Sequence, residues 1–216
     1  MKRIHLFHAA SVSLMLALAP FAHADIVTNG TFGSGTSPSL SGWTQTGSGT
    51  SPGTGIQAIK FQPAPSTQFG DNIPMDGAIN TGAYFVDDAA AEVLSQNITL
   101  AGNTNYVLSF DLFKTVTGAG NPGLFTLTAS DGTVLGSFTG SGLATAVWTP
   151  ESLAFTSGAA GSYTLSYTFD SGPAPAQDVV LTNVAVNAAT PEPTSLLLLG
   201  SGLLGIAGAA RRRFSI

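Results

Sequence analysis

The strictest constraint on the fold is a stretch in which apolar and polar side chains alternate one by one. From Ser162 to Phe169 every second residue is apolar, and the residues between are serine or threonine. Because successive side chains of a strand point to opposite faces, this pattern predicts a β-strand with one buried face. Asn105 to Lys114 repeats the pattern, with four large apolar residues on one side: Tyr106, Leu108, Phe110 and Leu112.

The rest of the segment between residues 25 and 189 follows the same plan. Two runs within Leu124–Ser137 flank Ser130-Asp131-Gly132-Thr133, whose Asp-Gly pair is a strong hairpin signal. Further strands are expected at Ile26–Phe32, Trp43–Thr46, Gly55–Phe61, Val93–Leu100, Ala144–Thr149, Glu151–Thr156 and Val179–Val186. Long loops are expected where Gly, Ser, Thr or Pro accumulate, at Gly33–Ser41, Gly47–Gly55 and Pro63–Asn80, with one helical turn at Asp87–Glu92. These elements predict an all-β domain, an antiparallel β-sandwich of jelly-roll type, over residues 25–189.

A different pattern ends the chain. An uncharged run, Ser195–Ala210, lies between Pro191-Glu192-Pro193 and Arg211-Arg212-Arg213. As a helix, Leu196–Ala210 would be about 22 Å long, against ~30 Å for a hydrocarbon core. Terminal arginines favour the cytoplasmic side of a membrane, and the prolines keep the preceding backbone extended. We predict a short C-terminal hydrophobic helix that inserts transiently into the membrane, since a buried core helix would not end in three arginines.

These three parts, in this order, resemble a PEP-CTERM sorting signal over residues 190–216. The resemblance implies recognition through Pro191, Glu192 and Pro193 and through the arginines Arg211, Arg212 and Arg213. It implies processing by an exosortase, a membrane enzyme of Gram-negative bacteria that resembles cysteine transpeptidases. Cleavage near the motif would then release the protein or transfer it to the cell surface or the extracellular matrix of a biofilm.

The other end predicts entry into the same route. Residues 1–24 begin with Lys2 and Arg3, continue through an apolar run and end in Ala22-His23-Ala24. This is the pattern of a secretory signal peptide with a small-residue cleavage site. We expect cleavage between Ala24 and Asp25, and secretion through the inner membrane.

Charge and composition exclude several functions for the segment between these signals. Residues 25–190 contain Lys60, Lys114, eleven acidic residues and no arginine, which gives a formal charge of −9. Nucleic acid is excluded as a partner because no basic surface is available for phosphates. The three histidines precede residue 25 and cysteine is absent, so the segment lacks the ligands of zinc, copper or iron sites. Calcium, which takes oxygen ligands, remains possible as a structural ion, and no other cofactor is expected.

A second resemblance covers most of this segment. Asn29-Gly30-Thr31-Phe32, Ser41-Gly42-Trp43 and Gly82–Asp88 are similar to galactose-binding-like jelly rolls, as are Leu94–Leu100, Asn105–Phe110 and Asp178–Val184. The resemblance implies a carbohydrate-binding-like module with extracellular polysaccharide as its partner. The chain departs from such domains at Thr182, where they usually carry aspartate, so an ion site at that position does not carry over.

The candidate site residues each have a plainer alternative. Exposed aromatic rings bind sugars, and the candidates are Trp43, Tyr84 and Trp148, although lone aromatic residues on strands usually pack in a core. Oxygen ligands for calcium are expected at Asp87, Asp88 and Asp178, although carboxylates in loops are commonly only solvated.

Catalytic residues are not expected. Gly49-Thr50-Ser51-Pro52-Gly53 fits a nucleophile motif, but no histidine is available to act as its base. Paired carboxylates for glycoside hydrolysis would lack arginine or histidine neighbours. We therefore expect a non-enzymatic secreted protein. A carbohydrate-binding module and a purely structural matrix protein stay open as alternatives, with a glycan-active enzyme as the weaker third.

Overall fold

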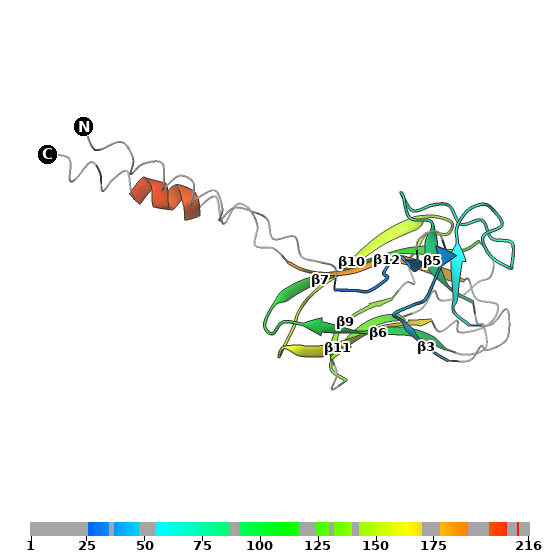
Figure 1. The fold of residues 1–216 in the computed structure, drawn as a ribbon, viewed down its shortest axis with the longest axis horizontal. Coiled ribbons are helices and arrows are strands. Elements are labelled where there is room, and N and C mark those ends of the chain that lie inside the picture. The colour runs from blue at the N-terminus through cyan, green and yellow to red at the C-terminus, as the bar shows by residue number, and fades with distance from the viewer. Residues whose placement is uncertain are drawn as a thin grey trace.

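The chain forms two antiparallel sheets packed face to face (Figure 1). This computed structural model describes residues 26–34, 37–47, 55–86, 91–116, 124–129, 132–139, 143–169, 178–189, 199–206 and 211. Within these ranges the strands are β1 (Gly33–Ser34), β2 (Ser37–Pro38), β3 (Thr44–Thr46), β4 (Gln57–Lys60), β5 (Thr81–Phe85), β6 (Glu92–Leu100), β7 (Asn105–Lys114), β8 (Leu124–Ala129), β9 (Val134–Thr139), β10 (Trp148–Thr156), β11 (Gly161–Phe169) and β12 (Val179–Ala188).

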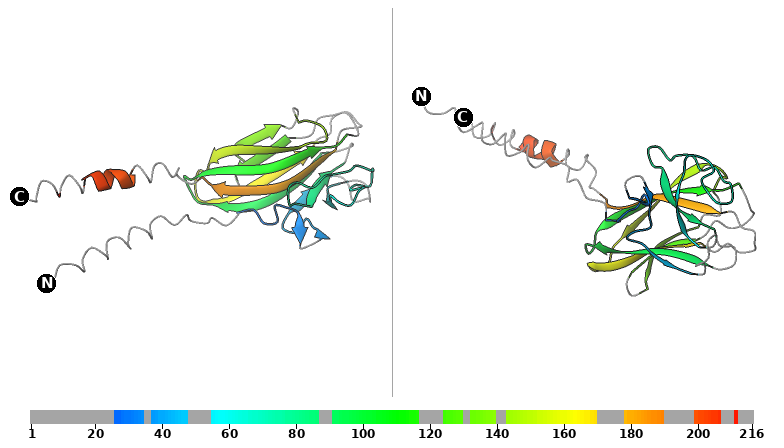
Figure 2. Two further views of the ribbon diagram at one scale, coloured as in Figure 1. Left: turned by 90° about the horizontal axis from the view of Figure 1, so that it is seen from above. Right: turned by 45° about the vertical axis from the view of Figure 1, so that its right-hand side comes forward.

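One sheet has the order β10-β7-β12-β5-β4, and we call it the β12 sheet. The other, the β11 sheet, has the order β3-β6-β11-β8-β9, and β1 pairs with β2 in a separate small hairpin. Figure 2 shows the long strands of each sheet running side by side. The predicted antiparallel β-sandwich is therefore confirmed, and the alternating runs became β7 and β11.

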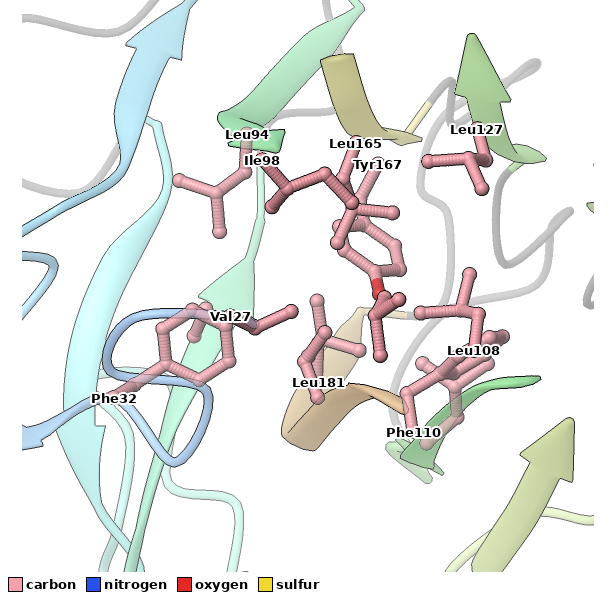
Figure 3. Close-up of a cluster of buried hydrophobic side chains, with 14 of the residues drawn as sticks. Val27, Phe32, Leu94, Ile98, Leu108, Phe110, Leu127, Leu165, Tyr167 and Leu181 are labelled. Carbon is pink, nitrogen blue, oxygen red and sulfur yellow. The ribbon is translucent and has the colours of Figure 1, made fainter. Parts of the chain in front are cut away.

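Most of the apolar core lies between the two sheets (Figure 3). Tyr167 of β11 is completely buried at its centre, between Ile98 and Leu165 on one side and Leu108 and Leu181 on the other. Burying side chains of this size contributes roughly 1.5–3 kcal/mol each to stability. The alternation in the sequence is therefore the direct cause of the sandwich.

A second apolar cluster covers the outer face of the β12 sheet. Ala83 and Phe85 belong to the core between the sheets, whereas Tyr84 belongs to the second cluster, so consecutive residues of β5 are buried on opposite faces. The loop between β4 and β5 supplies the cover, with Ile73 1% exposed. The other members are Ile59, Phe61, Val86, Phe113 and Val180, with Ile79 and Trp148 packed against them. At this end the β12 sheet is buried on both faces.

Three sequence predictions need correction. Residues 26–32 form turns instead of a strand, with positive φ at Asn29 (53°) and Phe32 (55°). The segment still contacts β12, because Ile26 N donates to the Val186 carbonyl oxygen and the Gly30 carbonyl oxygen accepts from Val184 N. Gly33–Ser41 contains the β1–β2 hairpin. In place of the two strands expected at Ala144–Thr149 and Glu151–Thr156 there is one strand, β10, which begins only at Trp148, so residues 144–147 lie outside it. Pro150 is tolerated within it because β10 lies at the edge of its sheet.

The C-terminal segment contains the expected helix at residues 199–206, with its side chains mostly exposed. Across the residues that the structure describes, no helix is both long enough and apolar enough to cross a membrane.

Candidate functional site

Tyr84, one of the predicted sugar contacts, is 0% exposed in the cluster on the outer face of the β12 sheet. Its hydroxyl donates to Oδ2 of Asp178 and lies 3.4 Å from Oδ2 of Asp71. Burial, followed by the hydrogen bond and charge of Asp178, raises the pKa of Tyr84 far above its usual value. A sugar at the surface cannot reach this ring, and the prediction of Tyr84 as a contact is corrected on that ground. Its position in the apolar run Ala83–Val86 was a sign of burial on both faces.

The same geometry defines the place of Asp178, a predicted calcium ligand. Its carboxylate accepts from the Tyr84 hydroxyl, and the residue is 8% exposed. The two other predicted ligands, Asp87 and Asp88, lie outside the described residues. In the described ranges, no three His, Cys, Asp or Glu side chains gather closely enough to hold a metal ion.

Trp43 and Trp148, the other predicted sugar contacts, are both half-buried. The Trp43 indole packs against Phe32 and Tyr167 and donates to the Asn29 carbonyl oxygen at 3.1 Å. Trp43 is therefore part of the packing of the fold.

Trp148 packs against the apolar cluster on the outer face of the β12 sheet. Its ring packs on Phe61 and Phe113, with centroids 5.2 and 5.3 Å away. Its indole N–H donates to the Pro74 carbonyl oxygen at 2.9 Å. The side chain fastens the β4–β5 loop to the sheet and leaves part of the ring on the surface.

A pair of carboxyl groups, not expected from the sequence, lies on the same outer face. Asp111 of β7 is 8% exposed and accepts a hydrogen bond of 2.7 Å from Asn183 Nδ2, at a β-bulge in β12. The carboxyl group of Asp76, in the β4–β5 loop, lies near that of Asp111. Burial, followed by the hydrogen bond and charge of Asp111, raises the pKa of Asp76 to about 6. Below a pH of about 6 Asp76 is therefore protonated, which removes the repulsion between the two carboxyl groups.

This pair predicts a stability that depends on pH. The pKa of Asp76 is higher in the folded chain than in the unfolded chain, so its contribution is complete below pH ~4 and is lost as the pH rises through about 6. We expect the loss to be about 1 kcal/mol after screening by solvent, or roughly 2–4 °C in Tm.

Thermal unfolding of Asp76→Asn between pH 4 and 7.5 checks the prediction, because the variant should lack this part of the pH dependence. Glu151→Gln, on edge strand β10, removes one carboxylate in the same way and serves as the control. An Asp76→Asn profile parallel to that of the wild type would contradict the assignment.

A hollow of about 350 Å³ lies where the start of β5 meets the β1–β2 hairpin. Figure 2 shows this hairpin, in blue, beside the β4–β5 edge of the β12 sheet. The hollow is lined by Thr31, Gly33, Lys60, Ala78, Ile79, Asn80 and Thr81. Thr81 Oγ1 donates to the Thr31 carbonyl oxygen at 2.8 Å, and the Thr81 carbonyl oxygen accepts from Thr182 at 2.8 Å.

Glycine at position 33 allows the β1–β2 hairpin to lie this close to β5. A Cβ at Gly33 would lie 2.7 Å from Thr81 Oγ1, so a larger residue would push the hairpin away from β5. The hollow is thus lined by both polar and apolar groups, and the Thr81 hydroxyl is held by its hydrogen bond to Thr31. Sequence reasoning missed it because its residues come from three separate stretches of the chain.

The remaining predicted site residues belong to the two ends of the chain. Ala24 and Asp25 at the expected signal cleavage site lie outside the described residues, as do Pro191, Glu192, Pro193, Arg212 and Arg213. Arg211 is helical and exposed.

Comparison with known proteins agrees with this fold. TmCBM61, a carbohydrate-binding module solved with β-1,4-galactotriose, is similar with a TM-score of 0.56 and 13% identity, over 77% of this chain and 100% of that one. An arabinose-bound MgGH51 α-L-arabinofuranosidase gives a TM-score of 0.53 at 16% identity, over 78% of this chain and 27% of that chain. The enzymatically active domain of tailspike protein 4 of bacteriophage CBA120 gives 0.51 at 16% identity, and this chain covers only 21% of it. The domain is a jelly-roll β-sandwich, and its fold is similar to that of TmCBM61.

The C-terminal segment is recognised independently. Residues 189–213 match the PEP-CTERM protein-sorting motif, which marks secreted, exosortase-processed proteins of the Gram-negative cell surface. No curated protein matches the chain in sequence. The chain therefore carries a PEP-CTERM sorting signal behind a jelly-roll domain.

Proposed function

We propose that this protein is a non-catalytic carbohydrate-binding module that an exosortase delivers to the cell surface or into the extracellular matrix. The observation that carries the proposal is the position of the sorting motif. Strand β12 ends at Ala188, and the motif begins at residue 189, directly after the last strand of the sandwich. Removal of the motif would leave in place every strand that the structure describes.

The sequence supports a route for this delivery. Residues 1–24 start export, and cleavage between Ala24 and Asp25 frees the N-terminus. The C-terminal helix then enters the membrane transiently, Arg211 to Arg213 hold its end on the cytoplasmic side, and the exosortase cuts near Pro191-Glu192-Pro193.

Its partner at the destination is an extracellular polysaccharide, such as the exopolysaccharide of a biofilm. The jelly-roll fold supports this partner class, and the polar hollow beside β5 offers a place for a sugar unit. Function on such a fold depends on the site, so direct binding has to be measured.

A structural matrix protein without a ligand is the second candidate. It is favoured by the burial of Tyr84 and by the engagement of both indole N–H groups within the fold. Binding of the full-length chain to an array of bacterial polysaccharides and oligosaccharides separates the two. The proposal expects at least one glycan to be bound with a Kd at or below about 1 mM, since a single small site gives weak affinity. An array without any bound glycan supports the structural role.

A further inference from the structure

The hollow beside β5 contains a cation in a domain that has few of them. Lys60, at the end of β4, is the only charged residue among those that line the hollow. It is exposed, and no ion pair joins it to a carboxylate in the described part of the chain. Lys60 and Lys114 are the only basic residues between positions 25 and 190, against eleven acidic ones. The ammonium group is therefore available to an anion from outside.

The other polar groups around Lys60 are held in place. The Asn80 side-chain oxygen accepts from the Gln62 backbone N–H at 3.0 Å, which fixes the amide and turns its Nδ2 donors away from Gln62. No described residue accepts from these donors. Lys60 pairs with Thr81 across β4 and β5, so the lysine, the amide and the threonine surround one space.

This combination suits a particular chemistry. Amide and hydroxyl groups bind the hydroxyls of a sugar, and a lysine ammonium binds a carboxylate or a sulfate as a compact point charge. The negative charge of the whole domain acts against a polyanion at long range, but physiological salt screens charges beyond ~8 Å. Contact at Lys60 then decides the affinity.

We propose that the hollow beside β5 is a binding site for an acidic saccharide, in which Lys60 contacts the carboxylate or sulfate of one sugar unit and Asn80 its hydroxyls. This proposal rests on the proposed carbohydrate-binding function and narrows it to negatively charged polysaccharides. The hollow accommodates a short stretch of the polymer, so the site recognises a sugar unit within a longer chain.

Titration calorimetry of the full-length chain in mild detergent tests the site with three probes. These are neutral β-1,4-galactotriose, the same trisaccharide carrying a sulfate ester, and trigalacturonate. We expect tighter binding of one or both anionic probes, and the better one identifies the anionic group. Lys60→Gln should weaken that binding by about tenfold to a hundredfold, because a hydrogen bond to a charged group is lost.

The chain provides a matched control for the charge change. Lys114→Gln removes the other lysine of residues 25–190, which lies at the C-terminal end of β7 and pairs with Val179 of β12. It should leave binding within about twofold of the wild type, because charges beyond a Debye length are screened. The acidic-saccharide site is overturned if the wild type binds anionic and neutral probes equally well. It is also overturned if Lys60→Gln and Lys114→Gln lose the same affinity. In both cases carbohydrate binding itself survives. Failure of the wild type to bind any of the three probes overturns the site, and an empty glycan array in addition overturns the carbohydrate-binding function.

Discussion

Replacing Pro191, Glu192 and Pro193 with alanine leaves most of the protein uncleaved and held in the membrane. The two prolines exclude helix and keep the segment before the apolar run extended, which presents its backbone to a protease-like enzyme. Three alanines would instead allow the C-terminal helix to continue towards the sandwich. We expect cleavage to slow by about a hundredfold, the discrimination that a shaped enzyme pocket readily gives.

Fractionation of cells that express the variant measures this effect, with the processed and unprocessed forms separated by mass. The control is alanine replacement of Thr190 and Thr194, which changes the same segment and keeps the motif. Wild-type processing of the motif variant would show that another part of the C-terminus is recognised.

The second large effect concerns the fold itself. At Gly30 the N-terminal segment lies directly on β12, and an added Cβ would stand 1.9 Å from the Val184 carbonyl oxygen. The Val184 atoms nearest to Gly30 are backbone atoms and cannot move aside easily. The two residues are also joined by a hydrogen bond of 3.0 Å from Val184 N to the Gly30 carbonyl oxygen. Gly30→Ala must push the segment away and disturb Phe32, which is 0% exposed in the core. We expect a loss of about 3 kcal/mol in the free energy of unfolding, or a Tm lower by roughly 6–12 °C.

Urea unfolding of Gly30→Ala and Gly161→Ala provides the comparison. Gly161, at the start of β11, has no atom within 4 Å of an added Cβ, so its variant should lose less than about 1 kcal/mol. Equal stability of the two variants would mean that residues 26–32 do not pack against β12 as described.

The strands that alternate cleanly were predictable because one physical cause determines them. In β7 and β11 the apolar residues Leu108, Phe110, Leu165 and Tyr167 recur at every second position, and only an extended strand places them on one face. Residues 26–32 contain similar residue types, but the contact of Gly30 with β12 and the positive φ of Asn29 override local propensity. That contact joins positions more than 150 residues apart, and no local pattern reports it.

The candidate site was less predictable for the same reason. Lys60, Asn80 and Thr31 come together through the pairing of β4 with β5 and the placement of the β1–β2 hairpin. The pair of Asp76 and Asp111 depends on a loop that folds back over the sheet. The sequence shows which residues are aromatic but not which of them are exposed, and Tyr84 proved to be buried. The sorting motif was readable because its parts are contiguous and act in sequence order.

On the proposed route, the jelly-roll domain reaches the cell surface after removal of its C-terminal signal. Intact mass spectrometry of the protein recovered from the cell surface and the medium tests this route. We expect a chain that begins at Asp25, ends close to Pro191-Glu192-Pro193 and lacks Arg211 to Ile216. Surface protein that retains the three arginines would show that the sorting signal is not removed.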